Sequence, residues 1–172
     1  MKIIIGLGNP GKNYENTRHN VGKSFLAYLT GDEKWQANKS LGFEYLKKGS
    51  LVFARPNCFM NESGPAVKKI LSFFKEKPEN TLLVHDDSDL VFGKLKLVMP
   101  QTSSAGHHGI ESVEKTFGKK KFSRIRIGIR PESSKDKAMD FVLKKLSKAE
   151  LALLEQNIFP KARTFLVDWL GM

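Results

Sequence analysis

The chain has only one cysteine, Cys58, among its 172 residues. A single cysteine excludes an internal disulfide and is typical of proteins that fold in a reducing compartment. No stretch reaches the roughly 18 consecutive apolar residues of a membrane-spanning helix. A strand pattern already begins at Lys2, so we expect no signal or transit peptide ahead of it. Together these absences favour a soluble, cytoplasmic protein.

Acidic residues are scarce: 18 Asp and Glu face 29 Lys and Arg, which gives a net charge of +11. A solubilising surface or a polyanionic partner such as a nucleic acid explains such a charge. Residues 115–130 contain seven basic side chains and no acidic one. Lys94 and Lys96 stand at alternating positions of a predicted strand, hence on one face. This clustering favours the nucleic-acid partner.

Strand and helix patterns alternate along the whole chain, without an internal repeat or a low-complexity linker. Apolar residues make up 40% and charged residues 27%, as in ordinary globular proteins. We therefore expect one domain over residues 1–172, a three-layer α/β/α unit with a twisted, mostly parallel mixed sheet.

The expected strands cover residues 2–8, 43–47, 51–55, 81–84, 94–98 and 122–129. The expected helices run from Val21 to about Gly31, from an N-cap at Ser63, over 110–117, and from a capping box at Ser147 with an interruption at Pro160.

Two polar groups follow predicted strands. The first strand runs into a glycine turn that carries Asn9, and the chain then reaches His19 at the head of a helix, capped by Asn16 or Thr17. A helix N-terminus disfavours imidazolium and keeps a neutral base available. Asp86 follows the strand 81–84, where a carboxylate can accept from histidine Nδ1–H and leave Nε2 as a base. A merely structural histidine is the alternative.

Other chemistries fit less well. Residues 6–11 match G-x-G-x-x-G, but a turn follows instead of the helix that a dinucleotide site requires. Cys58 is more readily explained as packing than as a nucleophile. Asn61 precedes a helix, as a cap residue or as a donor to an oxyanion. A metal site remains an alternative without a recognised ligand spacing. Its candidate ligands are His85, Asp86, Asp87, Asp89, His107 and His108.

Several segments, in order along the chain, resemble the bacterial peptidyl-tRNA hydrolase family. These segments are Gly6–Gly11, Tyr14–Gly22, Phe59–Asn61 with Ser63-Gly64, His85-Asp86 with Asp89-Leu90, Gly106-His107 with Gly109, and Arg124–Gly128. Each is weak alone, whereas the ordered set is highly specific.

The resemblance implies an esterase that uses no cofactor and no metal, acting as a monomer on peptidyl-tRNA. It assigns the general base to His19 and the carboxylate partner to Asp86. It assigns recognition of the blocked amino group to Asn9. It assigns substrate contacts to Tyr14, Phe59 and Asn61, and contacts with tRNA phosphates to Lys94, Lys96 and Arg126.

One position departs from the family pattern, since His108 replaces an asparagine that contacts substrate. An imidazole differs from an amide in reach and can gain a charge near neutral pH. We also expect C-terminal helices, at about residues 147–170, to pack near the cleft. The rival interpretation is a non-catalytic RNA-binding protein on the same scaffold.

Overall fold

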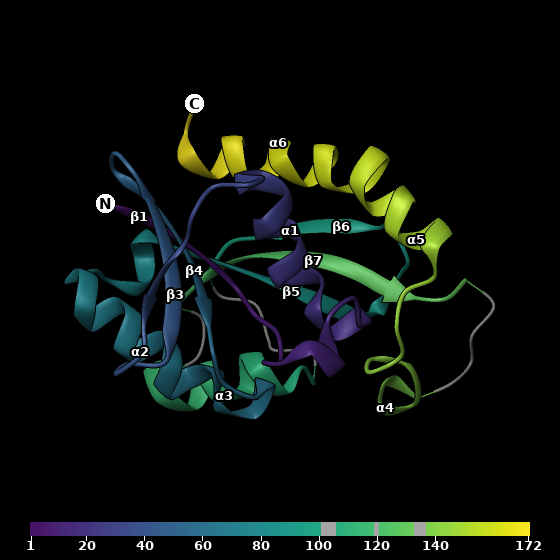
Figure 1. Cartoon of the computed structure of the whole chain (residues 1–172), viewed down its shortest axis with the longest axis horizontal. Helices are drawn as coiled ribbons and strands as arrows, with labels where there is room; N and C mark the ends of the chain where they lie inside the picture. Colours follow the sequence, from purple (N-terminus) through teal and green to yellow (C-terminus); the bar gives the residue numbers. More distant parts are fainter. Residues whose placement is uncertain (101–105, 119–120, 133–136) are drawn as a thin grey trace.

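The computed structural model describes residues 1–100, 106–118, 121–132 and 137–172, and its centre is a seven-stranded sheet (Figure 1). In order across the sheet the strands are β2 (Gln36–Asn38), β3 (Phe43–Lys48), β4 (Leu51–Pro56), β1 (Lys2–Gly6), β5 (Thr81–Val91), β7 (Ser123–Arg130) and β6 (Leu95–Val98). The four central strands β4, β1, β5 and β7 are parallel. Antiparallel pairs extend the sheet at both edges. The expected mixed α/β sheet is therefore confirmed.

Helices cover both faces of this sheet (Figure 1). One face carries α1 (Val21–Thr30), α5 (Lys148–Leu153) and α6 (Phe159–Leu170), and the other carries α2 (Ser63–Phe74) and α3 (His108–Phe117). The alternation of β1 divides the core accordingly, because Ile4 packs toward α1 while Ile3 and Ile5 pack toward α2. The shorter elements are α4 (Ala138–Phe141) and the 3₁₀ turns η1 (Lys12–Tyr14), η2 (Arg18–Asn20), η3 (Met60–Glu62) and η4 (Pro78–Asn80). None of the described helices is both long and apolar enough to cross a membrane.

Several boundaries differ from those expected. The strand predicted over residues 81–84 continues to Val91, because pairing with β7 extends through Asp86 and Asp87. Asp86 thus lies within a strand instead of just after it. Ser63 is not an N-cap; the preceding 3₁₀ turn leads directly into α2, and the Ser63 hydroxyl donates to the Met60 carbonyl. The short elements β2 and α4 were not predicted.

The C-terminal helical region follows the sequence signals closely. Ser147 and Glu150 form the predicted capping box at the start of α5. A π-helical turn, η5 (Leu154–Ile158), links α5 to α6. Pro160 lies in the first turn of α6, where its missing N–H is tolerated, so the chain changes helix type there without leaving the helix.

Two glycines let α1 approach the sheet closely. A Cβ added at Gly22 would lie 2.3 Å from the Val84 carbonyl oxygen, and one added at Gly6 would lie 2.6 Å from the Gly22 oxygen. Any larger residue would push α1 away from β1 and β5. This close packing holds the residues just before α1 against the ends of the central strands.

Candidate active site

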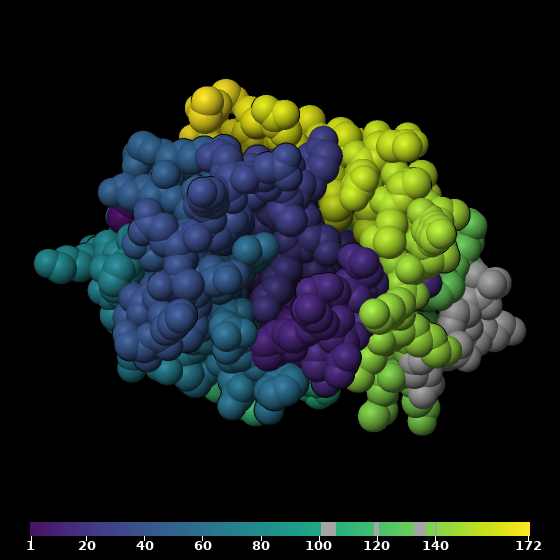
Figure 2. Space-filling view, viewed as in Figure 1, coloured from purple at the N-terminus to yellow at the C-terminus, as the bar shows by residue number. Residues whose placement is uncertain are grey.

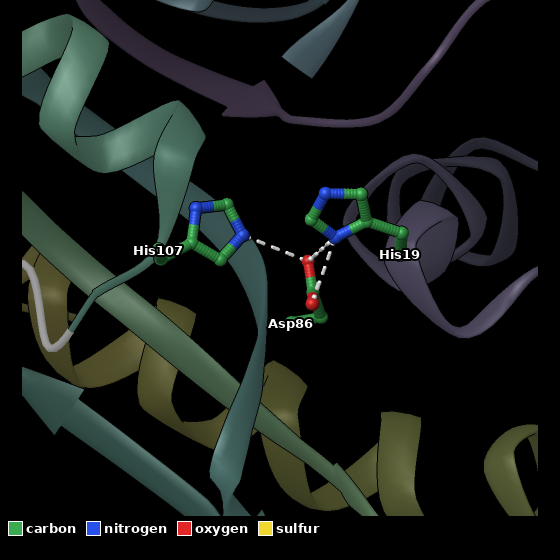
Figure 3. Close-up of side chains that lie close together, drawn as sticks. All are labelled: His19, Asp86 and His107. Carbon is green, nitrogen blue, oxygen red and sulfur yellow. Dashed lines mark hydrogen bonds and ion pairs between the residues drawn. The ribbon is translucent and has the colours of Figure 1, made fainter. Parts of the chain in front are cut away.

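His19 and Asp86 form a buried pair between the start of α1 and strand β5 (Figure 3). The His19 Nδ1 atom lies 2.9 Å from each of the two carboxylate oxygens of Asp86. Because the carboxylate is an acceptor, Nδ1 carries the proton that it donates. The Nε2 lone pair of His19 is then available as a base, and this nitrogen points away from Asp86 in Figure 3.

The backbone around His19 is fixed by a segment distant in the sequence. The His19 N–H donates to the Val142 carbonyl at 2.8 Å, and the Arg18 N–H donates to the Lys144 carbonyl at 3.1 Å. The buried Arg18 guanidinium also pairs with Glu150 at 2.6 Å. Figure 2 shows the yellow-green chain after α4 lying against the purple N-terminal loop. His19 is therefore held in place from both sides.

Burial and charge act in opposite directions on the His19 imidazole. Burial alone lowers the pKa of His19, but the charge of Asp86 and its hydrogen bond outweigh burial and raise the pKa above the ordinary 6.5. Burial likewise favours the neutral carboxyl of Asp86, yet the two histidines beside it hold the pKa of Asp86 well below its usual range. The pair thus combines a stable carboxylate with an imidazole whose pKa lies above its ordinary value.

A second histidine, His107, completes the site. Its Nε2 lies 2.9 Å from the Asp86 Oδ1 atom, and its ring centroid lies 5.2 Å from that of His19. Its Nδ1 accepts hydrogen bonds from the N–H groups of Gly109 and Ile110, so His107 is the N-cap of α3. Since Nδ1 is an acceptor, the proton resides on Nε2 and is donated to Asp86. The helix cap therefore fixes the tautomer of His107.

His85 lies behind His107. Its ring is buried and meets the His107 ring edge to face at 4.6 Å, while its Nδ1 donates to the Asp86 carbonyl at 2.6 Å. Burial, the largest effect, and the neighbouring His107 hold the pKa of His85 well below 6.5. His85 is therefore a neutral packing partner within this cluster.

The ligand atoms of His19, Asp86 and His107 lie within 4.8 Å of one another, so this trio could in principle hold a metal ion. Metal binding through His107 Nε2 would require the proton to move to Nδ1. The Nδ1 proton would then point at the N–H groups of Gly109 and Ile110, which now donate to Nδ1, and both of these hydrogen bonds would be lost. The cap thus opposes metal ligation by His107.

Asn9 is held by neighbouring residues on three atoms. Its backbone N–H donates to Asn20 Oδ1 at 2.8 Å, and its carbonyl accepts from Asn20 Nδ2 at 3.0 Å. Its side-chain Oδ1 accepts from the Met60 N–H at 2.8 Å. With Oδ1 occupied in this way, Nδ2 is the remaining polar atom of the Asn9 side chain, and Asn9 lines the active-site cavity.

The active-site cavity has a volume of about 430 Å³. His19, Asp86 and His107 form its polar floor, and Asn61 lies on the wall. Exposed apolar side chains surround this floor: Phe59, Met139 and Leu143 are 49%, 80% and 51% exposed. Tyr14 meets the Phe59 ring edge to face at 6.0 Å, next to the cavity lining. A polar floor under an apolar rim suits a ligand that has both polar and apolar parts.

The C-terminal contribution to this cavity comes from Ala138, Met139, Val142 and Leu143, and not from residues 147–170. The reason is that α5 and α6 bury their apolar faces beside α1 on the sheet. No sequence signal marks residues 138–143, which are too short for a clear helical periodicity.

His108 and His107 lie in different environments although they are adjacent. The His108 side chain is 78% exposed, and its Nδ1 lies 3.3 Å from Glu111 on the next turn. It lines the cavity but contacts neither His19 nor Asp86 among the interactions of the described residues. His107, which the sequence analysis named as a metal alternative and within the family segment Gly106-His107 but gave no role in the reaction, is the imidazole beside His19.

The basic residues assigned to tRNA fall into two groups. Lys94, in the turn before β6, and Lys96, within β6, are exposed. Arg126 lies opposite Lys96 on β7, but its Nε donates to Asp87 at 2.5 Å and its side chain is 12% exposed. The structure therefore offers the two lysines as freely accessible cations, whereas Arg126 is already paired.

The basic run at residues 115–130 is not a uniform strip. Lys119 and Lys120 lie outside the described residues. Lys115 and Lys121 are exposed, but Arg124 is buried. Arg124, Arg126 and Arg130 alternate with buried isoleucines along β7, so the three arginines lie on one face of the sheet.

Comparison with known proteins identifies the family. A family model described as peptidyl-tRNA hydrolase matches residues 3–171. The peptidyl-tRNA hydrolase of Mycobacterium avium is 42% identical over 158 residues, 87% of this chain and 81% of that protein. The enzyme of that name from Mycoplasma capricolum is 38% identical over 169 residues, 94% and 89% of the two chains. The crystal structure of peptidyl-tRNA hydrolase from Acinetobacter baumannii superposes with a TM-score of 0.82 at 27% identity, covering 99% of this chain and 91% of that one. This chain belongs to the peptidyl-tRNA hydrolase family.

Proposed function

We propose that this chain hydrolyses the ester bond between a peptide, or an N-blocked amino acid, and tRNA, with His19 as the general base. The observation that carries the proposal is the buried His19–Asp86 pair on the floor of a cavity, in a chain that belongs to this hydrolase family. Release of free tRNA returns it to translation, so the place of action that we propose is the cytoplasm.

The reaction needs one base and one carboxylate. A water molecule loses a proton to His19 Nε2 as its oxygen bonds to the ester carbonyl carbon, and the carbonyl oxygen becomes an oxyanion. Asp86 remains ionised and stabilises the imidazolium through Nδ1. When the tetrahedral intermediate collapses, the bond to the ribose oxygen breaks and the imidazolium returns its proton to that oxygen. The products are a free carboxylic acid and a tRNA 3′ hydroxyl.

The side-chain amides of Asn61 and Asn9 can donate hydrogen bonds to the substrate, which His19 does not provide when it acts as a base. Asn61 lies on the cavity wall, where its amide can donate to the developing oxyanion. The Nδ2 group of Asn9 can donate to a carbonyl of the acylated amino group. General-base catalysis typically contributes ~10²–10⁴-fold, so positioning and oxyanion stabilisation must provide the remaining acceleration.

His107 is a positioning residue in this scheme. It gives Asp86 Oδ1 a fixed N–H donor, and the α3 cap prevents that donor from becoming an acceptor. The carboxylate is thereby held at the angle that His19 requires. Among the residues of the site, this is the role that the sequence reasoning missed.

The tRNA contacts in this proposal are to the acceptor stem, through backbone phosphates and not base edges. Such contacts suit an enzyme that accepts tRNAs of many sequences. Lys94 and Lys96 provide the exposed charge. Phe59 and Tyr14 lie at the cavity rim, where they can contact the end of the substrate. The proposed unit is a monomer that needs no protein partner.

A single-turnover assay on N-acetyl-aminoacyl-tRNA tests the proposal. We expect the wild-type chain to release the tRNA, and His19→Ala to lose at least ~10²-fold in rate while still binding the tRNA. Wild-type activity should also survive exhaustive chelation, since water activation is assigned to His19. A His19→Ala rate above about a tenth of wild type would contradict this assignment. Failure of the wild type to hydrolyse any N-blocked substrate would favour a non-catalytic RNA-binding protein.

A further inference from the structure

A second cavity, of about 530 Å³, lies on the other side of the Asn9 turn from the reacting centre. It is bounded by the loop after β1, by α1 and by the end of β4. Among the residues that the structure describes, Asn9 is the one that lines both cavities. The roles proposed above for the catalytic residues make no use of this second space.

Two partly buried cations, Lys23 and Arg55, face this cavity, and Glu44 forms a salt bridge with Arg55 but not with Lys23. Lys23, on α1, donates from Nζ to the neutral carbonyl of Asn9 at 3.3 Å, and no carboxylate in the described part of the chain forms a salt bridge with it. Arg55, at the end of β4, is held over the Trp35 ring at 3.9 Å and pairs with Glu44 at 3.0 Å. The positions of both cations are thus defined, and the carboxylate of Glu44 is already engaged by Arg55.

The charge of Lys23 is poorly compensated in its surroundings. Burial, with the nearby Arg55 charge, lowers the pKa of Lys23 to about 8, although the Cys58 thiol and Glu44 act in the opposite direction. Lys12 and Glu15 also line the cavity, but both side chains are exposed. An anion placed beside Lys23 would supply the counter-charge that the protein itself does not provide.

The rest of the lining is suited to a polar ligand. Asn16, Asn20 and Asn57 contribute amides, and Ser24 contributes a hydroxyl. The Ser24 hydroxyl donates to the Asn20 carbonyl and the Asn20 amide donates to the Asn9 carbonyl. The amides of Asn16 and Asn57 can donate to the oxygens of one ligand, whereas an apolar ligand would leave them unpaired. The cavity therefore favours a compact, multiply charged oxyanion over a lipid or an aromatic molecule.

We propose that this cavity binds a phosphate group on Lys23 and Arg55. A guanidinium and an ammonium approaching from different elements match the several acceptor oxygens of phosphate. Two sources carry this chemistry: a phosphodiester of the single-stranded 3′ end of the tRNA substrate, or free inorganic phosphate. The shared wall at Asn9 places the cavity next to the reacting ester, and the assignment to tRNA rests on the proposed function.

Inorganic phosphate is the first probe, because its binding can be measured without catalysis. Titration calorimetry or amide chemical shifts at constant ionic strength should detect phosphate binding at pH 7, with shifts at Asn9, Lys23 and Asn57. The affinity should fall severalfold as the pH rises through about 8, because Lys23 loses its charge there. We expect Lys23→Met to weaken binding about tenfold, and Lys68→Met, an exposed lysine on α2, to leave it unchanged.

The second measurement compares two ester substrates. N-acetyl-aminoacyl-tRNA contains the 3′ phosphodiesters, whereas N-acetyl-aminoacyl-adenosine contains none. If the tRNA occupies the cavity, Lys23→Met and Arg55→Met each raise KM about tenfold for the tRNA substrate alone, and inorganic phosphate competes with that substrate alone. If the source is free phosphate, the phosphate titration is positive and the two KM values do not separate.

The proposal is overturned if wild type binds no phosphate at pH 7 and the two substrates respond equally to the variants. Equal damage to both substrates would mean that Lys23 only supports the Asn9 turn through its hydrogen bond. These outcomes are distinct from failure of the proposed function, because phosphate binding does not depend on turnover. His19→Ala, which should abolish turnover of both substrates, should leave phosphate binding intact.

Discussion

The buried histidine cluster and the exposed β6 edge both consist of polar side chains that can carry a positive charge, but they differ in how firmly those side chains are held. In the cluster, His19 and His107 both donate to one carboxylate, and each is oriented by backbone contacts from other elements. At the β6 edge, Lys94 and Lys96 are exposed. Chemistry at one bond requires side chains with a single orientation. Binding to a charged backbone requires only cations within reach.

This difference sets the sizes of the expected effects. Removing one member of the cluster leaves another buried polar group unpaired, and the loss falls on the reacting geometry. Removing an exposed lysine removes one screened contact among several. Variants of the cluster should therefore change kcat, while variants of the lysine edge should change KM and its salt dependence.

The largest effect should come from Asp86→Asn. The introduced amide has one acceptor atom, and the cap of α3 keeps His107 a donor to it. The amide NH₂ group then faces His19 Nδ1 and draws the proton to Nε2, which can no longer act as a base. We expect kcat to fall by ~10³–10⁴.

The pH–rate profile of Asp86→Asn provides a second readout. Loss of the carboxylate removes the charge that raises the pKa of His19, so the acidic limb should move to lower pH. A profile that keeps its acidic limb in place would show that His19 is not the group that titrates.

His107 has two roles, since it caps α3 through Nδ1 and donates to Asp86 through Nε2, and substitutions can test these two roles separately. His107→Asn can still cap α3, since asparagine is a good N-cap, but it is too short to replace the Nε2–H donor. We expect kcat to fall about tenfold with little change in melting temperature. The acidic limb should move to higher pH, because Asp86 with one donor fewer interacts more strongly with His19.

His107→Ala is the matched control for this variant. It removes both roles, so it should lower kcat equally and also destabilise the protein by about 1 kcal/mol through loss of the cap. If His107→Asn retains wild-type kcat, the hydrogen bond to Asp86 has no part in positioning the carboxylate.

The lysine edge should show a smaller effect. Lys96→Met should raise KM for full-length tRNA severalfold and reduce the salt slope by about 1, with unchanged kcat. Lys68→Met on α2 serves as the control for charge alone. Arg126→Ala should behave differently, because it leaves the buried Asp87 unpaired, and a lower melting temperature should accompany its change in KM. An Arg126→Ala variant of normal stability with raised KM would restore the direct tRNA contact expected from sequence.

The smallest effect should come from His108→Asn, which restores the family residue. The sequence led us to expect that an imidazole at position 108 contacts substrate and can gain a charge near neutral pH. The structure places His108 at the exposed rim, paired with Glu111, and places His107 beside His19. We now expect kcat to lie within about twofold of wild type and the acidic limb of the pH–rate profile to stay in place. The effect of this variant should fall on KM. A shifted limb in the pH–rate profile would show that His108 turns inward when substrate binds.

Much of the fold could be predicted because its signals are local. The continuous apolar run Ile3, Ile4 and Ile5 is typical of a strand that is buried on both faces. The Ser147 and Glu150 pair marks the start of a helix. Asp86 was expected just after a strand, whereas β5 continues past it, because strand length depends on pairing with β7. Pairing with a distant segment leaves no local pattern.

The sequence by itself determined the α/β class and the family, and it predicted the hydrogen bond between His19 Nδ1 and Asp86, because each depends on residue types in a given order. The tertiary structure decided which of two adjacent histidines belongs to the site, that Arg126 is paired, and that α4 lines the cavity. It also revealed the second cavity behind Asn9. The physical reason is that burial, tautomer and ion pairing are set by neighbours remote in the chain: Asp86 meets His107 only because α3 begins beside β5.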